Sequence, residues 1–591
     1  MESHHGKRFR SKHRPPLRLS RGRAKAAMIA VVSVLFLGGF IVSAVPEAES
    51  WLSGLFETEY TYDAATEAIQ DLKDDITWSN QPVTRRANLS GVSKIDLTET
   101  LPDISKFPLV VRPPGGGVVA ELFVSSEKAG ANTDGWLREA AQQFNASGAQ
   151  LGSGRAARIA VRKIASGTAY QFIASGKYQP AGYSPSNHLW IEMAKAHGVG
   201  MQAVSEKLVS NVAGIVMKTE VAERLRAQYT DLTVPNLIDA VVQGDLVMGY
   251  TNPFASSTGL NFLVTILSEF AGGDAAKLLS DDVASAFESF QQGVPFVALT
   301  TLQMRDSVAN DGSLDAFVME HQTFARTPAL ASGYEFLPFG IVHDNPLYAL
   351  DAATPEQREV LELFARQLES GASVSKATQY GFNAGPAHQS SYALPPGPQL
   401  IQAQKLWKEK KDAGRPIQAV FLCDISGSMR GARLAGLKAA LRDGAEFIGR
   451  DNSIGLAAFN NATTVLLPIK RFNLNHKASF HAAVDALSAG GNTAMYDGVV
   501  VALDMLIEAQ RANPKAKPML FVLSDGETNK GLKFNGVNKV VQGLQIPIYT
   551  IGYEANLAEL GRLSSLVEAA SLNADSGEIR YKIGALLNAQ M

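Results

Sequence analysis

Apolar residues in this chain fall into short runs that alternate with amphipathic stretches, from about Leu101 onward. In the first part of this region the predicted strands are Val118–Val124, Ala156–Ile164 and Leu246–Tyr250. Apolar residues at helical spacing predict helices at about Asp134–Phe144, His188–His197 and Pro355–Leu368. Strands that alternate with helices in this way indicate α/β layers with a mainly parallel sheet over residues 105–384.

Residues 416–591 form a second α/β region, in which the alternation is clearer. Its predicted strands are Ile417–Cys423, Ile454–Phe459, Thr464–Ile469, Met519–Leu523 and Ile546–Ile551. Its predicted helices are about Leu434–Ile448, Lys477–Leu487, Met495–Gln510 and Leu557–Leu566. The last two strands are almost unbroken apolar runs, which is typical of strands buried on both faces of a parallel sheet.

Two segments without this alternation flank the first region. Residues 46–104 are polar and irregular apart from one helix-like stretch, Ala64–Ile76, and we interpret them as a stalk. Residues 385–415 begin with a run rich in proline and small polar residues, which is typical of a semi-rigid spacer. We interpret residues 385–415 as a linker between the two α/β regions.

The N-terminus has the pattern of a membrane segment. Residues 1–25 hold nine Lys and Arg against one acid, Glu2, and precede an uncharged apolar run, Ala26–Val45. At about 1.5 Å per residue this run is long enough to cross roughly 30 Å of hydrocarbon, and the charge asymmetry places the N-terminus in the cytoplasm. We therefore expect a basic tail (1–25), a signal-anchor helix (26–45) in the cell membrane and extracytoplasmic domains. A signal peptide cleaved at Val42-Ser43-Ala44 is the alternative, and it also exports the chain.

Composition narrows the function classes. The net charge of −2 gives no electrostatic basis for nucleic-acid binding. The single cysteine, Cys423, excludes a disulfide within the chain, and its place at the end of an apolar run predicts a buried thiol.

Side chains with oxygen atoms gather at one edge of the second predicted sheet. Asp424-Ile425-Ser426-Gly427-Ser428 follows the first strand, Ser524-Asp525-Gly526 follows the fourth, and Gly490-Gly491-Asn492-Thr493 precedes a helix. Ligands of open α/β sheets bind in loops at this edge. The oxygen ligands that Mg²⁺ prefers are available from two carboxylates and three hydroxyls: Asp424, Asp525, Ser426, Ser428 and Thr493. With only two carboxylates, the ion would keep an affinity for an external carboxylate.

This pattern resembles the metal-ion-dependent adhesion site of von Willebrand factor A domains. The segments Gly490–Gly498 and Phe521–Thr528 are also similar to that family throughout. The resemblance implies a doubly wound, Rossmann-like domain over residues 416–591, a bound Mg²⁺ (or Mn²⁺ or Ca²⁺), and capture of an acidic side chain of a partner protein. A metal ion with a purely structural role is the alternative.

Hydroxyl groups also gather before predicted helices in the first α/β region. They belong to Phe123–Lys128, Tyr183–Asn187 and Gly249–Gly259, which resemble parts of bacterial extracytoplasmic solute-binding proteins of the two-lobed periplasmic type. Pro355–Phe382 resembles the closing helix of those proteins. Hydroxyls and free N–H groups at helix N-termini suit a small polar or anionic solute. We therefore predict an interlobe cleft lined by Ser125, Ser126, Ser184, Asn252, Ser256 and Ser257, with helix capping or a ligand-free scaffold as alternatives.

An anchor followed by these two domains resembles a bacterial class of membrane-anchored proteins that combine them. The leading hypothesis is a non-enzymatic, membrane-anchored receptor that uses a metal-dependent A domain to capture a protein partner. The second is a solute-binding receptor for transport or sensing, with an accessory A domain. No enzyme is predicted, because the scattered histidines show no metal spacing or triad and Gly115-Gly116-Gly117 lacks the Lys-Ser/Thr of a phosphate-binding loop.

Overall fold

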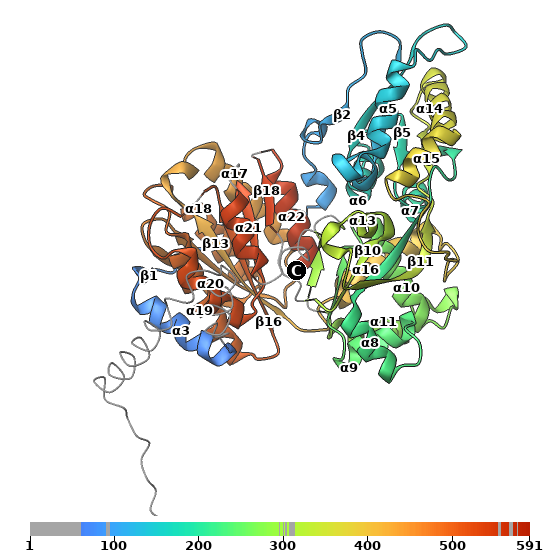
Figure 1. Ribbon diagram of the computed structural model, residues 1–591. Helices are drawn as coiled ribbons and strands as arrows, with labels where there is room; N and C mark the ends of the chain where they lie inside the picture. Colours follow the sequence, from blue (N-terminus) through green and yellow to red (C-terminus); the bar gives the residue numbers. More distant parts are fainter. Residues whose placement is uncertain are drawn as a thin grey trace, which may run out of the picture. The chain divides into compact units, whose positions relative to one another are not determined.

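The computed structural model describes residues 61–89, 95–294, 296–298, 301, 304–305, 314–526, 528–553, 557–566, 571–575 and 577–591 (Figure 1). The expected basic tail and signal-anchor helix, residues 1–45, lie outside these residues. Among the residues described, no helix has both the length and the apolar composition needed to cross a membrane.

The middle domain, from β2 to α15, begins with a lobe built on a six-stranded sheet of order β2-β4-β3-β5-β12-β6. Its strands are β2 (Leu109–Val111), β3 (Val118–Val124), β4 (Ala157–Lys163), β5 (Gly182–Ser184), β6 (Met201–Ser205) and β12 (Leu347–Leu350). Its helices are α4 (Ser126–Ala129), α5 (Trp136–Ala146), α6 (Ser166–Ala174), α7 (Leu189–Ala196), α14 (Pro355–Leu368) and α15 (Gly371–Gln379). We call this part the first lobe.

The second lobe contains a five-stranded sheet of order β11-β7-β10-β8-β9. Its strands are β7 (Asn211–Lys218), β8 (Met248–Thr251), β9 (Phe296–Ala298), β10 (Ala316–Glu320) and β11 (Tyr334–His343). Its helices include α8 (Thr219–Gln228), α9 (Val234–Gln243), α10 (Ser257–Phe270), α11 (Asp281–Gln291) and α13 (His321–Ala325). Residues Ser257–Ser268 of α10 are all buried, which is typical of a helix at the centre of a domain.

The chain crosses between the lobes twice, from β6 to β7 and from β11 to β12. Both sheets are mixed, not mainly parallel as expected: β7 pairs antiparallel with β10 and β11, and β12 pairs antiparallel with β5 and β6. The apolar pattern of a strand does not show its direction, so the sequence could not distinguish parallel from antiparallel pairing.

The C-terminal domain has a seven-stranded sheet of order β1-β15-β14-β13-β16-β17-β18, and all its adjacent pairs are parallel except β14 with β15. Its strands are β1 (Trp78–Asn80), β13 (Ile417–Asp424), β14 (Ser453–Phe459), β15 (Thr463–Arg471), β16 (Lys517–Ser524), β17 (Ile548–Tyr553) and β18 (Ser571–Ala574). One face packs on α17 (Ala432–Gly444), α18 (Leu474–Ala486) and α22 (Ile579–Gln590). The other packs on α19 (Met495–Ala512), α20 (Phe534–Leu544) and α21 (Leu557–Ser565). This is the expected doubly wound fold, and Cys423 is buried as predicted.

Part of the expected stalk belongs to this domain instead. Helix α3 (Tyr62–Asp74) buries Ala65 and Ile69 in the core that also contains α19 and α20. Strand β1 follows and pairs parallel with Thr463–Val465 at the edge of the sheet. Ala65 and Ile69 are four residues apart, so they lie on one face of the helix. The helix was predictable from this spacing, but its partner was not.

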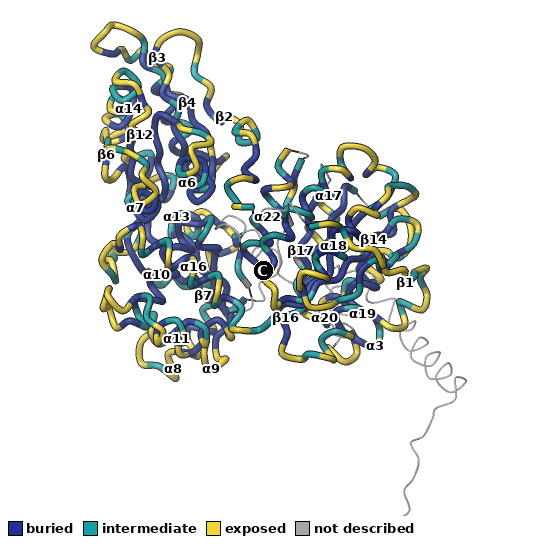
Figure 2. Tube along the Cα trace, turned by 180° about the vertical axis from the view of Figure 1, so that it is seen from behind, coloured by how far each residue is buried: buried dark blue, intermediate teal, exposed yellow. Residues whose placement is uncertain are grey.

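Part of the expected linker also folds. Helix α16 (Gly397–Lys410) packs against α7 and α10, and Leu400, Ala403 and Trp407 are fully buried. The indole N–H of Trp407 donates to the hydroxyl of Tyr250 at 2.7 Å. Figure 2 shows buried positions along α16 as well as along the strands of the sheets. The proline-rich part therefore ends before the apolar stripe of α16 begins.

Candidate functional site

The first predicted metal ligand, Asp424, ends β13, and its side chain is fully buried. One carboxylate oxygen, Oδ1, accepts a hydrogen bond from the backbone N–H of Ser426 at 2.7 Å. The other, Oδ2, accepts from the hydroxyl of Ser524 at 2.6 Å. Because Ser524 ends the neighbouring parallel strand β16, this bond joins two strand ends at the edge of the sheet.

Ser428 and Asp525 form the solvent-facing side of the same cluster. Ser428 is exposed, and its hydroxyl donates to Oδ1 of Asp525 at 2.8 Å. The hydroxyl oxygens of Ser426 and Ser428 are 3.0 Å apart; since the Ser428 proton is directed to Asp525, Ser426 is the donor. The guanidinium of Arg433 lies 2.8 Å from Oδ2 of Asp525, so a cation from α17 already neutralises this carboxylate.

The loop that carries Thr493 is hydrogen-bonded to the other two loops. The backbone N–H of Gly427 donates to the carbonyl of Gly491 at 2.9 Å. The carbonyl of Thr493 accepts from the N–H of Asn529 at 3.0 Å and from the hydroxyl of Thr528 at 2.9 Å. Gly491 has φ of +87°, a conformation that favours glycine. The structure therefore connects all three predicted segments at one edge of the sheet.

The donor set of this cluster fits a hard divalent cation. Burial raises the pKa of Asp424, hydrogen bonds from Ser524 and Ser426 lower it, and the charge of Asp525 raises it again. A nearby cation would offset both the burial and the repulsion. No group of three or more His, Cys, Asp or Glu side chains suited to a metal occurs in the described part of the chain. A metal here would therefore depend on hydroxyl as well as carboxylate oxygens, which are ligands that Mg²⁺ accepts.

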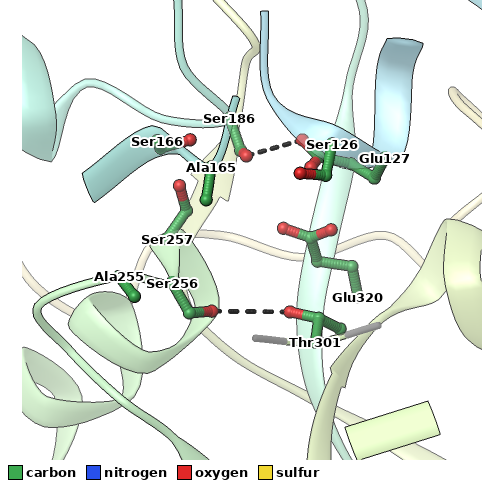
Figure 3. A pocket seen from close by; sticks show the side chains of 10 residues that line it. All are labelled: Ser126, Glu127, Ala165, Ser166, Ser186, Ala255, Ser256, Ser257, Thr301 and Glu320. Carbon is green, nitrogen blue, oxygen red and sulfur yellow. Dashed lines mark hydrogen bonds between the residues drawn. The ribbon is translucent and has the colours of Figure 1, made fainter. Parts of the chain in front are cut away.

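A second candidate site is a cavity of about 30 Å³ in the middle domain (Figure 3). Both lobes line it. The first lobe contributes Ser126, Glu127, Ala165, Ser166 and Ser186, and the second contributes Ala255, Ser256, Ser257, Thr301 and Glu320. Helices α4, α6 and α10 all begin at residues of this lining.

Three of the six residues predicted for the cleft line this cavity, namely Ser126, Ser256 and Ser257. Ser256 is also the N-cap of α10, because its hydroxyl accepts from the N–H of Gly259 at 3.3 Å. The hydroxyl of Ser257 accepts from the indole N–H of Trp190 at 2.9 Å. The capping role and the cavity position therefore occur together at Ser256.

The other three predicted residues, Ser125, Ser184 and Asn252, are not among the lining residues, because local contacts engage their side chains. Ser125 donates to Oε1 of Glu127. The hydroxyl of Ser184 accepts from the ammonium of Lys128 at 2.9 Å, and Oδ1 of Asn252 accepts from a backbone N–H two residues on. Of two adjacent serines such as Ser125 and Ser126, sequence alone does not tell which one faces a cavity.

Sequence reasoning missed the two carboxylates of the cavity, Glu127 and Glu320. Glu127 accepts hydrogen bonds from Ser125 and, at 2.6 Å, from Ser186. Glu320 accepts from Thr258 at 3.1 Å through Oε1. Burial and the charge of Glu320 raise the pKa of Glu127, while nearby Lys128 lowers it. A signal for Glu320 was present, since it ends the apolar run of β10 just as Asp424 ends that of β13.

Comparison with known families agrees with both folds. Residues 419–578 match the model of the von Willebrand factor type A domain, and residues 128–383 match that of the bacterial extracellular solute-binding protein. The chain therefore carries one domain of each type, as expected from its sequence. We call the C-terminal one the A domain from here on.

Individual relatives share only parts of the chain. A segment of 154 residues is 27% identical to inter-alpha-trypsin inhibitor heavy chain H3 of Mesocricetus auratus, covering 24% of this chain and 17% of that protein. The von Willebrand factor type A structure from Catenulispora acidiphila is 17% identical with a TM-score of 0.28, covering 29% of this chain and 42% of that one. The sulfate-binding protein SubI from Mycobacterium tuberculosis H37Rv is 12% identical with a TM-score of 0.33, covering 50% and 91%. At these identities no ligand or partner carries over.

Proposed function

We propose that this protein is a membrane-anchored extracytoplasmic receptor whose A domain captures a protein partner through a divalent metal ion. The observation that supports this most is the hydrogen-bonded cluster of Asp424, Ser426, Ser428 and Asp525 at the carboxyl ends of β13 and β16. Together with the hydroxyl of Thr493, these residues would hold Mg²⁺, and Mn²⁺ or Ca²⁺ would use the same oxygen atoms.

The charge of the cluster also supports partner capture. The negative charges of two carboxylates no more than balance the charge of a divalent ion. One of these carboxylates, Asp525, is also paired with Arg433. The ion would therefore retain an affinity for one more anionic ligand, and an acidic side chain of a partner protein would supply it. Exposed Ser428 supports access from solvent on this side of the cluster.

Thermal unfolding with and without Mg²⁺ tests the metal site. A ligand that binds only the folded state stabilises it, by about 2.7 kcal/mol at a concentration a hundred times its Kd. Millimolar Mg²⁺ is expected to raise the Tm of the wild-type protein and to leave that of Asp424→Ala unchanged. The matched control is Asp451→Ala, an exposed carboxylate just before β14, at the opposite edge of the sheet. A wild-type Tm that neither Mg²⁺ nor Mn²⁺ alters would contradict the proposal.

A second candidate function is binding of a small solute by the middle domain, for transport or sensing. One observation favours it: side chains from both lobes, at the first residues of three helices, line one cavity. A cleft built from two lobes in this way could close around a ligand.

A further inference from the structure

Among the residues that the structure describes, the lining of the interlobe cavity includes two carboxylates and no positively charged side chain. Its polar lining consists of hydroxyls and the carboxylates of Glu127 and Glu320, and only 2% of Glu320 is exposed. Figure 3 shows the Glu320 carboxylate directed across the cavity toward Ser126 and Glu127. A buried carboxylate is costly unless a cation or hydrogen bonds compensate it.

Lys128, the residue after Glu127, does not offer its ammonium to the cavity. Its side chain is fully buried, and Nζ donates to the carbonyl and the hydroxyl of Ser184 at 3.0 and 2.9 Å. A third bond goes to the carbonyl of Pro185 at 3.0 Å. Because an ammonium has three N–H groups, all donors of Lys128 are used. With both carboxylates ionised, it reduces the net charge of the group to −1, and it leaves no donor for a ligand.

His343 adjoins Glu320 but contributes no charge. Its Nδ1 lies 3.0 Å from Oε1 of Glu320. Its Nε2 lies 3.1 Å from the amide nitrogens of both Asn187 and Asn261, which are donors. Nε2 must therefore accept, so the proton is on Nδ1 and the imidazole is neutral. Three titratable groups then set the charge: Glu127, Glu320 and Lys128.

The helix N-termini at the cavity do not make it an anion site. Each N-terminus is equivalent to roughly half a positive charge, which favours an anion. Here the protein's own carboxylates, Glu127 and Glu320, already supply the negative charge in the cavity at which α4, α6 and α10 begin. An added sulfate or phosphate would meet two carboxylates at close range.

Two hydroxyls in the lining remain available for a ligand. Ser166 is only 4% exposed, and in the part of the chain that the structure describes its hydroxyl has no hydrogen-bond partner. The hydroxyl of Ser126 likewise has none among the described residues. Because Ser166 is almost fully buried and lines the cavity, its unused oxygen is placed to contact a species bound there.

We propose that the middle domain takes a small monovalent cation, a metal ion or ammonium, held by oxygen atoms of Glu127, Glu320, Ser126 and Ser166. This inference rests on the second candidate function and names its ligand class. One positive charge balances the net charge of the buried group. A cavity of about 30 Å³ has room for roughly two water-sized particles. A bare metal ion or ammonium fits this volume.

The test uses the full-length protein in choline chloride with EDTA, so that divalent ions are absent and the only other cation is too large for the cavity. Ammonium, potassium or sodium chloride then replaces choline chloride at constant ionic strength, and Tm and calorimetric binding are recorded. At least one of these ions is expected to raise Tm saturably. Its affinity should fall at least tenfold in Glu320→Gln, which keeps an acceptor for His343, and severalfold in Ser166→Ala. The control Glu362→Gln, an exposed residue of α14, should behave as wild type.

Three results would overturn the proposal. Stabilisation by sulfate, phosphate or molybdate but not by the cations would leave solute binding intact and reject the ligand class. No response to any ion would reject both. An equal cation response in wild type, Glu320→Gln and Ser166→Ala would place the ion elsewhere. None of these results bears on the A domain, whose test uses Mg²⁺ and Asp424→Ala.

Discussion

A buried carboxylate requires a cation or hydrogen-bond donors, and the two candidate sites meet this requirement differently. Asp525 has the guanidinium of Arg433 at 2.8 Å and the hydroxyl of Ser428 at 2.8 Å. Glu320 has the hydroxyl of Thr258 and a neutral imidazole. The A-domain cluster therefore includes its own substitute for a metal charge, whereas the ammonium of Lys128 only partly offsets the two carboxylates of the interlobe cavity. An incoming metal ion must compete with Arg433.

Replacing Arg433 by methionine is expected to raise the Mg²⁺ affinity of the A domain. An ion pair near the surface is worth up to about 1 kcal/mol, so the gain should be about three- to fivefold. Titration calorimetry with MgCl₂ measures it. Arg430→Met is the control, since Arg430 is an exposed arginine in the same loop. An unchanged or weaker affinity in Arg433→Met would show that the guanidinium does not compete with the ion.

The residues of the A-domain cluster could be predicted because each one directly follows an apolar strand or precedes a helix. Asp424 and Asp525 carry that signal in their positions, and the structure places both as expected at one edge of the sheet. The residues that line the interlobe cavity were harder to predict from the sequence. Glu320 carries the same signal but stands outside the hydroxyl clusters, and Ser166 has only Thr168 as a nearby hydroxyl. Which of several serines faces a cavity depends on packing that sequence does not show.

At the scale of elements, local pattern predicted which segments fold but not where they pack. The helix-like spacing of Ala64–Ile76 corresponds to α3, yet nothing in that spacing indicates that α3 covers α19 and α20. In the middle domain, likewise, the pattern predicted strands but not whether neighbouring strands are parallel or antiparallel. Helix α3 is fixed by one ion pair as well as by apolar contact: Lys73 pairs with Asp504 of α19 and lies over the ring of Trp78, 4.3 Å from its centroid.

Lys73→Met should destabilise the A domain by about 3 kcal/mol, because it leaves the carboxylate of Asp504, whose side chain is 4% exposed, without a cation. The double variant Lys73→Met with Asp504→Leu should recover most of this loss, since both charges are then removed. Urea unfolding measures both free energies. Lys515→Met, an exposed lysine, is the control. Equal stability of Lys73→Met and wild type would show that the Lys73–Asp504 ion pair contributes little to the attachment of α3.

At the scale of the whole described chain, the middle domain is inserted into the A domain. Strand β1 precedes the middle domain in sequence and β13 follows it, yet both belong to the same seven-stranded sheet. Two apolar clusters, one on each face of that sheet, and separate clusters in the two lobes show that each part has its own core. The expected sequence of stalk, domain, linker and domain is therefore replaced by a domain within a domain.

The charge asymmetry around Ala26–Val45 predicts the topology of the protein. Because nine basic residues precede this run and acidic residues follow it, a reporter fused after Trp51 should lie outside the cytoplasm. Alkaline phosphatase, which is active only after export, should be active there, and the protein should fractionate with membranes. A cytoplasmic reporter fused at the same position is the control and should be inactive. The reverse pattern would contradict export.

The pairing of β1 with β15 also has a consequence for biosynthesis. Ser79 and Thr464, which face each other in this pair, are 385 residues apart in the chain. The ribosome therefore releases β1 long before its partner exists, whereas every strand of the two lobes emerges in between. The middle domain can finish folding during translation, while β1 still lacks its partner strand β15. Closing such a long loop is slow, so a truncated or stalled chain would expose β1 and the apolar face of α3.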